Sequence, residues 1–194
     1  CTPLTLIYGP CGRILSSKGL SKFVVDYVQM IQTNAERLNN LIHELIEFRR
    51  IETGNREVRI EALNVSSLMK NTAKTFVDMA KSRNITFLSK IPEQVSWNSD
   101  KGFLNTIIIN LISNAFKYTP PGKTITVRVK SDDENVVVAV QDQGVGIQPS
   151  KVAMLFQRFD TILQDNIYQQ STGIGLSLVK QLVDLHHARI DVQS

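Results

Sequence analysis

The sequence lacks the features that mark a membrane-spanning or secreted protein. No run approaches the roughly 20 apolar residues that a membrane-spanning helix needs, and the N-terminus has no signal-peptide pattern. Only two cysteines are present, Cys1 and Cys11, in no metal-binding or disulfide pattern, which indicates a reducing compartment. The net charge of +4 is small and the basic residues are scattered, which argues against nucleic-acid binding.

The sequence does have enough apolar residues for a core. Hydrophobic residues make up 42% of the 194 residues, which excludes a disordered tail and suits one large domain or two small ones. The first residue is Cys rather than Met, so we expect the sequence to be a piece of a longer protein.

The first quarter of the sequence predicts a helical hairpin. Its apolar residues recur at the alternating steps of a coiled-coil seam, at Val24, Val28, Ile31, Ala35, Leu38, Ile42 and Leu45, with Tyr27, Leu41 and Phe48 widening the face. The same steps occur upstream at Leu4, Ile7, Cys11 and Ile14. Ser16–Gly19 should form the turn, and Pro3 and Pro10 should kink or end the first helix. Because one hairpin cannot cover this face, we expect a homodimer that forms a four-helix bundle.

Near Gly54 the long helical pattern ends, and short β-rich runs then alternate with helices. This change predicts two domains, 1–55 and 56–194. In the second domain we expect strands at Val58–Val65, Ile85–Ile91, Thr124–Val129 and Val136–Gln141, and the start of another at Arg189–Gln193. The third and fourth should pair around a polar turn at 131–135. We expect helices from Ser66–Ser67, as the cap, to Ser82, from Asp100 to Tyr118, and from Gly175 to His186, with a loop at Phe159–Thr172. The pattern predicts an α+β protein whose second domain is an α/β sandwich with a mobile lid.

The stretch from Asn110 to Thr119 holds the first candidate site. Asn110 and Asn114 lie four residues apart, so both amides project from one helix face. An amide oxygen can bind Mg²⁺ without adding negative charge near a polyphosphate, and Lys117 could reach a phosphate. The alternative is that these residues are the polar side of an exposed helix.

Two glycine-containing motifs follow. Asp142-Gln-Gly144-Val-Gly146 comes after a strand, where the carboxylate could accept a hydrogen bond from an adenine amino group, although this pattern is as typical of a turn. Gly173-Ile-Gly175 leads into a helix whose first N–H groups could bind a phosphate. Between the two motifs, Leu155–Phe159 reads by itself as an amphipathic turn in the core.

The order and spacing of these four segments resemble the N, first glycine, F and second glycine boxes of the sensor histidine kinases of two-component signalling. Thr2–Ile7 resembles the end of the H box, and Asn34–Leu38 and Phe48–Glu52 are similar to the second dimerisation helix. The resemblance covers essentially the whole chain and implies a dimeric helical hairpin followed by an ATP-binding domain of the histidine kinase, gyrase and chaperone type. Gly9-Pro10 and Asn114–Pro120 are closest to hybrid sensors with a fused receiver.

The resemblance also implies roles for individual residues. Asn114 would be the principal Mg²⁺ ligand with Asn110 beside it, Lys117 and Arg158 would contact phosphates, and Thr2 would help to dephosphorylate a receiver. Tyr118 would lie against adenine and Asp142 would bind its amino group. The other implied nucleotide contacts are Gly144, Gly146, Ile147, Phe156, Phe159, Thr172, Gly173, Gly175 and Leu176.

The reaction implied by the resemblance is transfer of the γ-phosphoryl group of ATP, with Mg²⁺, to a histidine, and then to an aspartate of a response-regulator receiver, separate or fused. The resemblance implies a cytoplasmic domain of a membrane-anchored sensor, in contact with the membrane only through segments outside this sequence.

The sequence departs from the family pattern at its histidines. Cys1 takes the basic position of the H box, so we expect the phosphoacceptor to precede this sequence. His43-Glu44-Leu45 imitates the H box, but no Thr-Pro follows, and we expect His43 to flank the helix bundle. His186 and His187 end the last helix, where cations suit the helix dipole. His187-Ala188 replaces the usual Gly-Gly, and the sequence stops short of the final glycine box.

Two other functions compete with the kinase interpretation. ATP-hydrolysing relatives of gyrase and of chaperones carry Glu at the position of Asn110, where a carboxylate can activate water and an amide cannot. A non-catalytic pseudokinase that dimerises and senses nucleotide is disfavoured by the intact Asn114, Asp142 and glycine boxes. The absence of the H-box histidine leaves that second alternative open.

Overall fold

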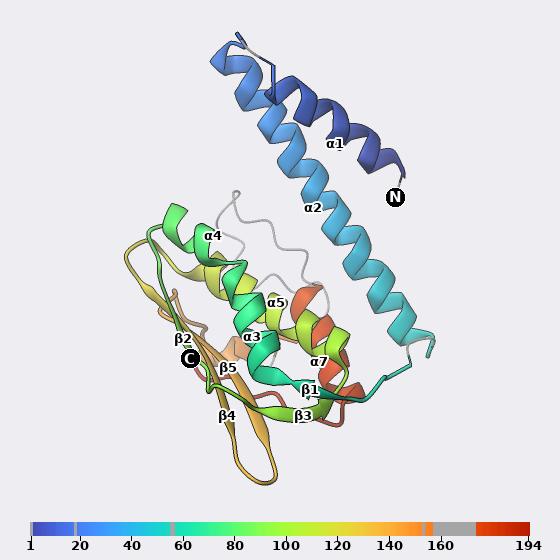
Figure 1. Cartoon of the computed structure of the whole chain (residues 1–194), viewed down its shortest axis with the longest axis vertical. Helices are drawn as coiled ribbons and strands as arrows, with labels where there is room; N and C mark the ends of the chain where they lie inside the picture. Colours follow the sequence, from blue (N-terminus) through green and yellow to red (C-terminus); the bar gives the residue numbers. More distant parts are fainter. Residues whose placement is uncertain (1, 18, 55–56, 153, 157–173) are drawn as a thin grey trace. The chain divides into compact units, whose positions relative to one another are not determined.

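The computed structural model of the chain describes residues 2–17, 19–54, 57–152, 154–156 and 174–194, with the main chain alone for residues 2–5, 37, 40, 43, 44 and 52. The chain forms two compact units, Cys1–Arg56 and Glu57–Ser194 (Figure 1). Each unit has its own pattern of packing. None of the described helices is long and apolar enough to cross a membrane.

The first unit is the expected helical hairpin, made of α1 (Thr2–Leu15) and α2 (Lys22–Glu52). Gly19, with φ of +81°, lies in the connection, and the Ser21 side chain caps α2 by accepting the Val24 N–H at 3.4 Å. Pro10 lies inside α1 without ending it. Of the two effects expected of proline, a kink or a local end, the second does not occur: α1 continues although Pro10 lacks the N–H that would bond to the preceding turn.

The apolar seam of α2 divides into two rows that differ in burial. Val28 and Ala35 are buried, 7% and 6% exposed, as is Cys11 of α1, which has a free thiol. Ile31, Leu38 and Leu45, which follow one another at seven-residue intervals, are each 49% exposed. The packing of α1 on α2 therefore leaves an apolar row of α2, defined by these three residues, uncovered in the single chain.

The second unit combines helices with two small sheets. Its helices are α3 (Val65–Lys74), α4 (Val77–Ser82), α5 (Lys101–Tyr118), α6 (Pro149–Val152) and α7 (Gly175–Leu185). Its strands are β1 (Glu61–Asn64), β2 (Thr86–Lys90), β3 (Ser96–Ser99), β4 (Thr124–Ser131) and β5 (Val136–Asp142). β1 pairs antiparallel with β3, while β4 lies between β2, to which it is parallel, and β5, to which it is antiparallel. The expected β4–β5 hairpin is thus confirmed.

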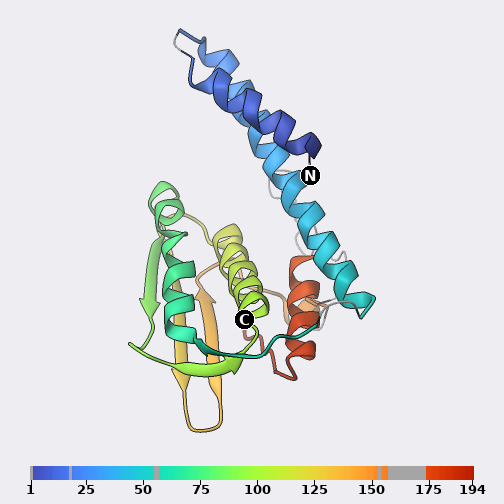
Figure 2. The ribbon, with the colours of Figure 1, turned by 45° about the vertical axis from the view of Figure 1, so that its right-hand side comes forward.

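The core of this unit lies between the helices and the three-stranded sheet. Phe116 of α5 is 1% exposed and packs against the rings of Phe76 and Phe87, with centroids 5.6 and 5.3 Å away. Ile108 and Ile112 on the same face of α5 are fully buried, as the sequence predicted. α5 lies between α3 and α7, as Figure 2 shows. Because α5 packs against a helix on each side, the polar residues along it have fixed positions.

The single helix expected at residues 66–82 is two helices in the structure, α3 and α4, and α3 begins one residue earlier than expected. Asn64, rather than Ser66 or Ser67, caps α3 by accepting the Ser67 N–H at 2.8 Å. The helix then breaks between α3 and α4. The Thr75 hydroxyl donates to the Thr72 carbonyl at 2.7 Å and competes with the helical hydrogen bonds.

Two strand predictions are corrected. β3 was not expected, because it is short and three of its four residues are exposed, so it carries little apolar pattern. The strand expected at Arg189–Gln193 is not formed in the described residues, because no neighbouring strand pairs with it there. The chain end instead contacts the loop after β5, where Ser194 Oγ accepts the Ile147 N–H at 2.7 Å.

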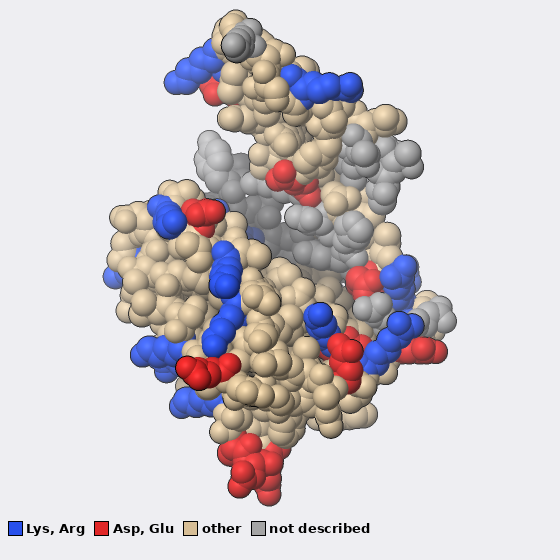
Figure 3. Space-filling model, viewed as in Figure 1, with Lys and Arg blue, Asp and Glu red and all other residues tan. Residues whose placement is uncertain are grey.

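The turn between β4 and β5 carries acidic side chains at its tip, seen at the lower end of the molecule in Figure 3. Asp132 accepts the N–H groups of Glu134 and Asn135 at 2.9 and 2.7 Å, and these bonds lower the pKa of its carboxyl. The charged form of Asp132 therefore closes the turn that the polar sequence at 131–135 predicted.

Replacing His187 by glycine is expected to stabilise this unit by about 0.5–1 kcal/mol. His187 has φ of +52°, and the His187 and Ala188 N–H groups bond to the Asp184 and Val183 carbonyls at 3.0 Å each, which is the Schellman ending of a helix. Glycine adopts this conformation without steric cost. Chemical denaturation of the two proteins would measure the difference. Asn84→Gly is the matched control, because Asn84 has φ of +53° but asparagine tolerates this region, so its gain should be smaller.

Candidate functional site

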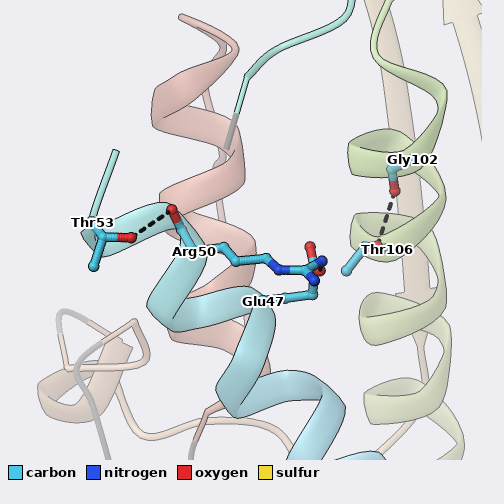
Figure 4. A network of polar contacts seen from close by, with 5 residues as sticks. All are labelled: Glu47, Arg50, Thr53, Gly102 and Thr106. Carbon is cyan, nitrogen blue, oxygen red and sulfur yellow. Dashed lines mark hydrogen bonds and ion pairs between the residues drawn. The ribbon is translucent and has the colours of Figure 1, made fainter. Parts of the chain in front are cut away.

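The site is built on α5, which begins where Asp100 caps it by accepting the Phe103 N–H at 2.9 Å. Asn110 and Asn114 are half-buried on this helix. The amide of Asn110 is fixed, because its Nδ2 donates to the Thr106 carbonyl at 2.9 Å. One turn earlier, the Thr106 hydroxyl donates to the Gly102 carbonyl at 2.9 Å (Figure 4). The oxygen of the Asn110 amide is thereby turned away from its own helix backbone.

The loop after β5 meets the C-terminal end of α5. Asp142 Oδ1 accepts the Gly144 N–H at 2.8 Å. A Cβ atom at Gly144 would lie 2.7 Å from the Tyr118 carbonyl oxygen and 2.6 Å from Asp142 Oδ1, so only glycine fits there. Gly146 has φ of +71°, a second position that favours glycine. This loop therefore holds the Asp142 carboxylate next to the last turn of α5, where Lys117 Nζ lies 5.2 Å from the centre of the Tyr118 ring.

The start of α7 meets the middle of α5. A Cβ atom at Gly175 would lie 2.7 Å from Asn110 Oδ1, so the backbone of α7 approaches this amide oxygen closely. Ile174, at the cap position of α7, has no polar side chain, whereas Ser21, Asn64 and Asp100 cap α2, α3 and α5. The first N–H groups of α7 and the positive end of its dipole therefore lie beside an amide oxygen of α5, an arrangement suited to an anion with a bound cation.

The structure thus brings together three of the segments that the sequence singled out: Asn110 to Tyr118, Asp142 to Ile147, and Gly175 with Leu176. Ile147, Phe156 and Leu176 are half-buried. The remaining candidates lie outside the described residues: Arg158, Phe159, Thr172, Gly173 and the side chains of Thr2 and His43.

A polar cluster that the sequence did not predict lies at the opposite end of α7. Asp100 is 7% exposed, and its N–H donates to His186 Nε2 at 3.1 Å. Ser99 Oγ lies 2.9 Å from the same nitrogen. Burial lowers the pKa of His186, an effect that Asp100 opposes and His187 reinforces.

The expectation that His186 acts as a cation at the end of the helix is therefore wrong. A nitrogen that accepts a backbone N–H carries no proton, so the ring is neutral in this geometry. No sequence pattern pointed to this contact, because Asp100 and His186 are far apart along the chain and neither belongs to a recognised motif.

The comparisons with known proteins concern the same region. Residues 99–194 match the family described as histidine kinase-, DNA gyrase B-, and HSP90-like ATPases. The chain is 32% identical to histidine kinase P4 of Formosa agariphila over 97% of its length, and 32% identical to the circadian input-output histidine kinase CikA of Synechococcus elongatus over 100%. It spans only 14% and 26% of the length of these two relatives.

Solved structures show the same fold. Full-length ShkA in complex with AMPPNP matches 94% of this chain and 38% of its own, with a TM-score of 0.72 and 23% identity. Histidine kinase ThkA in complex with the response regulator protein TrrA matches 96% of this chain and 52% of its own, with a TM-score of 0.66 and 21% identity.

Proposed function

Since this chain contains the ATP-binding region of a sensor histidine kinase, we propose that it binds Mg²⁺-ATP and transfers the γ-phosphoryl group to a histidine that precedes Cys1 in the full-length protein. A receiver aspartate then takes the phosphoryl group. The observation that carries the proposal is the close approach of the start of α7 to Asn110 Oδ1, on the helix whose last turn contacts the loop that holds Asp142.

The phosphate end of the nucleotide would lie between α5 and α7. Asn114 and Asn110 would bind Mg²⁺ through amide oxygens, which are hard ligands of the kind this ion prefers. When bound, the ion neutralises charge on the phosphates. The first N–H groups of α7 would bind phosphate oxygens, with Lys117 and Arg158 adding positive charge.

The base of the nucleotide would lie at the loop after β5. Asp142 Oδ1 is occupied by the Gly144 N–H, and among the described residues nothing bonds to Oδ2, which would accept the adenine amino group. Tyr118 would lie against the ring, with Ile147, Phe156 and Leu176 supplying apolar contacts. The close packing of Gly144 holds the carboxylate in place for this contact, and Gly146 lets the loop turn.

Transfer to histidine is favoured over hydrolysis by the residue at position 110. An imidazole is itself a nucleophile and needs no strong base, whereas a water molecule does. The amide of Asn110 cannot accept a proton at neutral pH, and its Nδ2 is already committed to the Thr106 carbonyl. A non-catalytic pseudokinase remains the second candidate, distinguished by whether phosphoryl transfer occurs at all.

Asp142→Asn is the test of nucleotide binding. A hydrogen bond to a charged acceptor contributes about 1.5–3 kcal/mol, so affinity for Mg²⁺-ADP should fall by about 10- to 150-fold. Isothermal calorimetry would measure this loss. The matched control is Asp132→Asn, which changes the same group at the tip of the β4–β5 hairpin and should leave affinity unchanged. Equal affinity in Asp142→Asn and the unaltered protein would contradict the adenine assignment.

We also propose that two hairpins associate as a homodimer. The uncovered row of Ile31, Leu38 and Leu45 would form its interface, completing a four-helix bundle.

Leu38→Glu is expected to dissociate this dimer while leaving the hairpin folded, because Leu38 is 49% exposed in the single chain. Burying an unpaired carboxylate at the interface would cost several kcal/mol. Light scattering at tens of micromolar should report a dimer for the unaltered chain and a monomer for the variant. Glu36→Gln, at an exposed position of α2, is the control and should stay dimeric. A monomeric unaltered chain would contradict the proposal.

The partner we propose is a response-regulator receiver, separate or fused, with Thr2 contributing to its dephosphorylation. In support, ThkA was crystallised with the response regulator protein TrrA, and a hybrid signal transduction histidine kinase of Dictyostelium discoideum is 27% identical to the chain. We place this region in the cytoplasm of the cell, as part of a membrane-anchored sensor.

A further inference from the structure

We infer that His186 is a positioning residue that holds α7 against the start of α5 and thereby sets the nucleotide affinity of the ATP-binding unit, and that it does so only in its neutral form. The inference rests on the proposed function, since it concerns the same site from the opposite end of α7.

The contact of His186 with α5 is specific. Its Nε2 lies 3.1 Å from the Asp100 backbone nitrogen, which donates, and 2.9 Å from Ser99 Oγ. The ring also packs against that of Phe103, with centroids 5.6 Å apart. Among the described residues Nδ1 has no hydrogen-bond partner, so Nε2 makes all of the polar contacts found for this ring.

Asp100 also bonds to the segment at the start of the ATP-binding unit, through Arg59. Its Oδ1 accepts the Phe103 N–H at 2.9 Å and caps α5, while its Oδ2 accepts the backbone N–H of Arg59 at 2.8 Å. Arg59 lies shortly after the boundary between the two units. One residue therefore ties three segments together: the entering chain, the start of α5 and, through His186, the end of α7.

The helix α7 contacts α5 at both of its ends. At the first end Gly175 packs against Asn110 Oδ1, and at the last His186 bonds to Asp100. Leu178, Val179, Leu182 and Val183 are buried between these points. An 11-residue helix is a rod of about 16 Å, so we expect a change at His186 to be transmitted along α7 to the contact of Gly175 with Asn110. The site for phosphate and Mg²⁺ lies at that end.

Protonation of His186 would break this arrangement. A proton on Nε2 would face the Asp100 N–H, and the hydrogen bond would be lost. The charged groups that face the ring are the Asp100 carboxylate, which favours its protonation, and His187, which opposes it, while burial lowers its pKa overall. The folded state thus binds a proton less readily than the unfolded state. The contact is complete above about pH 6.5, the ordinary histidine pKa, and is lost as the pH falls through the lower pKa that His186 has in the folded protein.

The test compares three variants of the chain in their affinity for a fluorescent ADP analogue with Mg²⁺, between pH 5.5 and 8. His186→Leu removes the acceptor, and His186→Gln keeps an acceptor that does not titrate. His187→Gln keeps the His186 acceptor and removes the neighbouring charge that lowers its pKa, so its loss of affinity should begin at a higher pH than that of the unaltered chain. Protonation of the nucleotide itself is common to all four proteins and cancels in the comparison.

At pH 7.5 we expect His186→Leu to bind about three- to tenfold more weakly, and His186→Gln within about twofold of the unaltered chain. From pH 7.5 to 5.5 the unaltered chain and His187→Gln should lose about three- to tenfold more affinity than His186→Gln does. Thermal unfolding of each variant, measured at the same pH values, identifies the temperature at which all are folded, and binding is measured there.

Parallel pH profiles for His186→Gln and the unaltered chain would overturn the inference, as would unchanged affinity in a folded His186→Leu. A merely structural histidine would change the melting temperature and leave the pH profile of affinity parallel. If the unaltered chain bound no nucleotide at any pH, the proposed function would fail first, and the two failures are therefore distinguishable.

Discussion

Alanine at Gly144 is expected to abolish measurable nucleotide binding and to lower the free energy of unfolding of the ATP-binding unit by about 1–3 kcal/mol. The added Cβ would lie 2.7 Å from the Tyr118 carbonyl oxygen and 2.6 Å from Asp142 Oδ1. Both are closer than van der Waals contact allows, and the carbonyl belongs to the backbone at the end of α5. The loop must therefore move away from α5 and carry Asp142 with it.

Gly122→Ala is the control that separates the effect of a steric clash from the effect of backbone strain. Gly122 has φ of +81°, but a Cβ there would meet no atom within 4 Å, so alanine costs only its left-handed conformation, about 1 kcal/mol. Calorimetric titration with Mg²⁺-ADP should show normal affinity for Gly122→Ala and none for Gly144→Ala. Chemical denaturation would give the two losses of stability. Normal affinity in Gly144→Ala would show that the loop carrying Asp142 is not part of the nucleotide site.

Much of the fold could be predicted because local signals were strong. The cap at Asp100 and the apolar period that includes Ile108 and Ile112 located α5 within a residue. Two β-branched runs around an acidic turn gave the β4–β5 hairpin. The alternating steps from Val24 to Leu45 predicted the helix that the structure has as α2, and in each case the period of the pattern matched one kind of element.

The parts that could not be predicted depend on contacts between distant residues. β3 has almost no apolar pattern, and it is a strand only because β1 lies beside it. The seam of α2 reads as one continuous stripe in the sequence, and only the position of α1 decides that Val28 is buried while Leu38 is not.

In the candidate site, too, the local patterns could be predicted and the contacts between distant residues could not. Its segments were found because their order and spacing form a recognisable series, although each alone was ambiguous. What the sequence could not give is their mutual contact, such as Gly175 against Asn110. It also suggested the wrong charge for His186, because a helix end favours a cation in the absence of other partners. A backbone N–H from Asp100 reverses that preference.

In a longer chain that includes the residues before Cys1, Asn114→Ala is expected to reduce ATP-dependent labelling of histidine by at least about a hundredfold, because charge stabilisation by a bound metal ion is worth several kcal/mol. Asn114 is half-buried on α5, one turn after Asn110, whose amide oxygen already lies beside the start of α7. Alanine keeps the helix and removes the oxygen. Incubation with γ-labelled ATP would be followed by tests of acid and base stability, because phosphohistidine is labile to acid and stable to base.

Ser113→Ala is the matched control, since Ser113 is exposed on the neighbouring position of the same helix and should leave labelling intact. Mapping of the labelled peptide then decides between the candidate acceptors. His186 is held by Ser99 and Asp100, and His187 follows the last residues of α7, so neither can enter the space at the start of α7 where the γ-phosphate would lie. In-line transfer requires the accepting nitrogen about 3–3.5 Å from phosphorus, and an error of 1 Å can cost about a hundredfold. Label should therefore appear upstream of Cys1. Label on His43 would overturn the assignment of the acceptor, and a longer chain that binds nucleotide but takes no label would identify the protein as a pseudokinase.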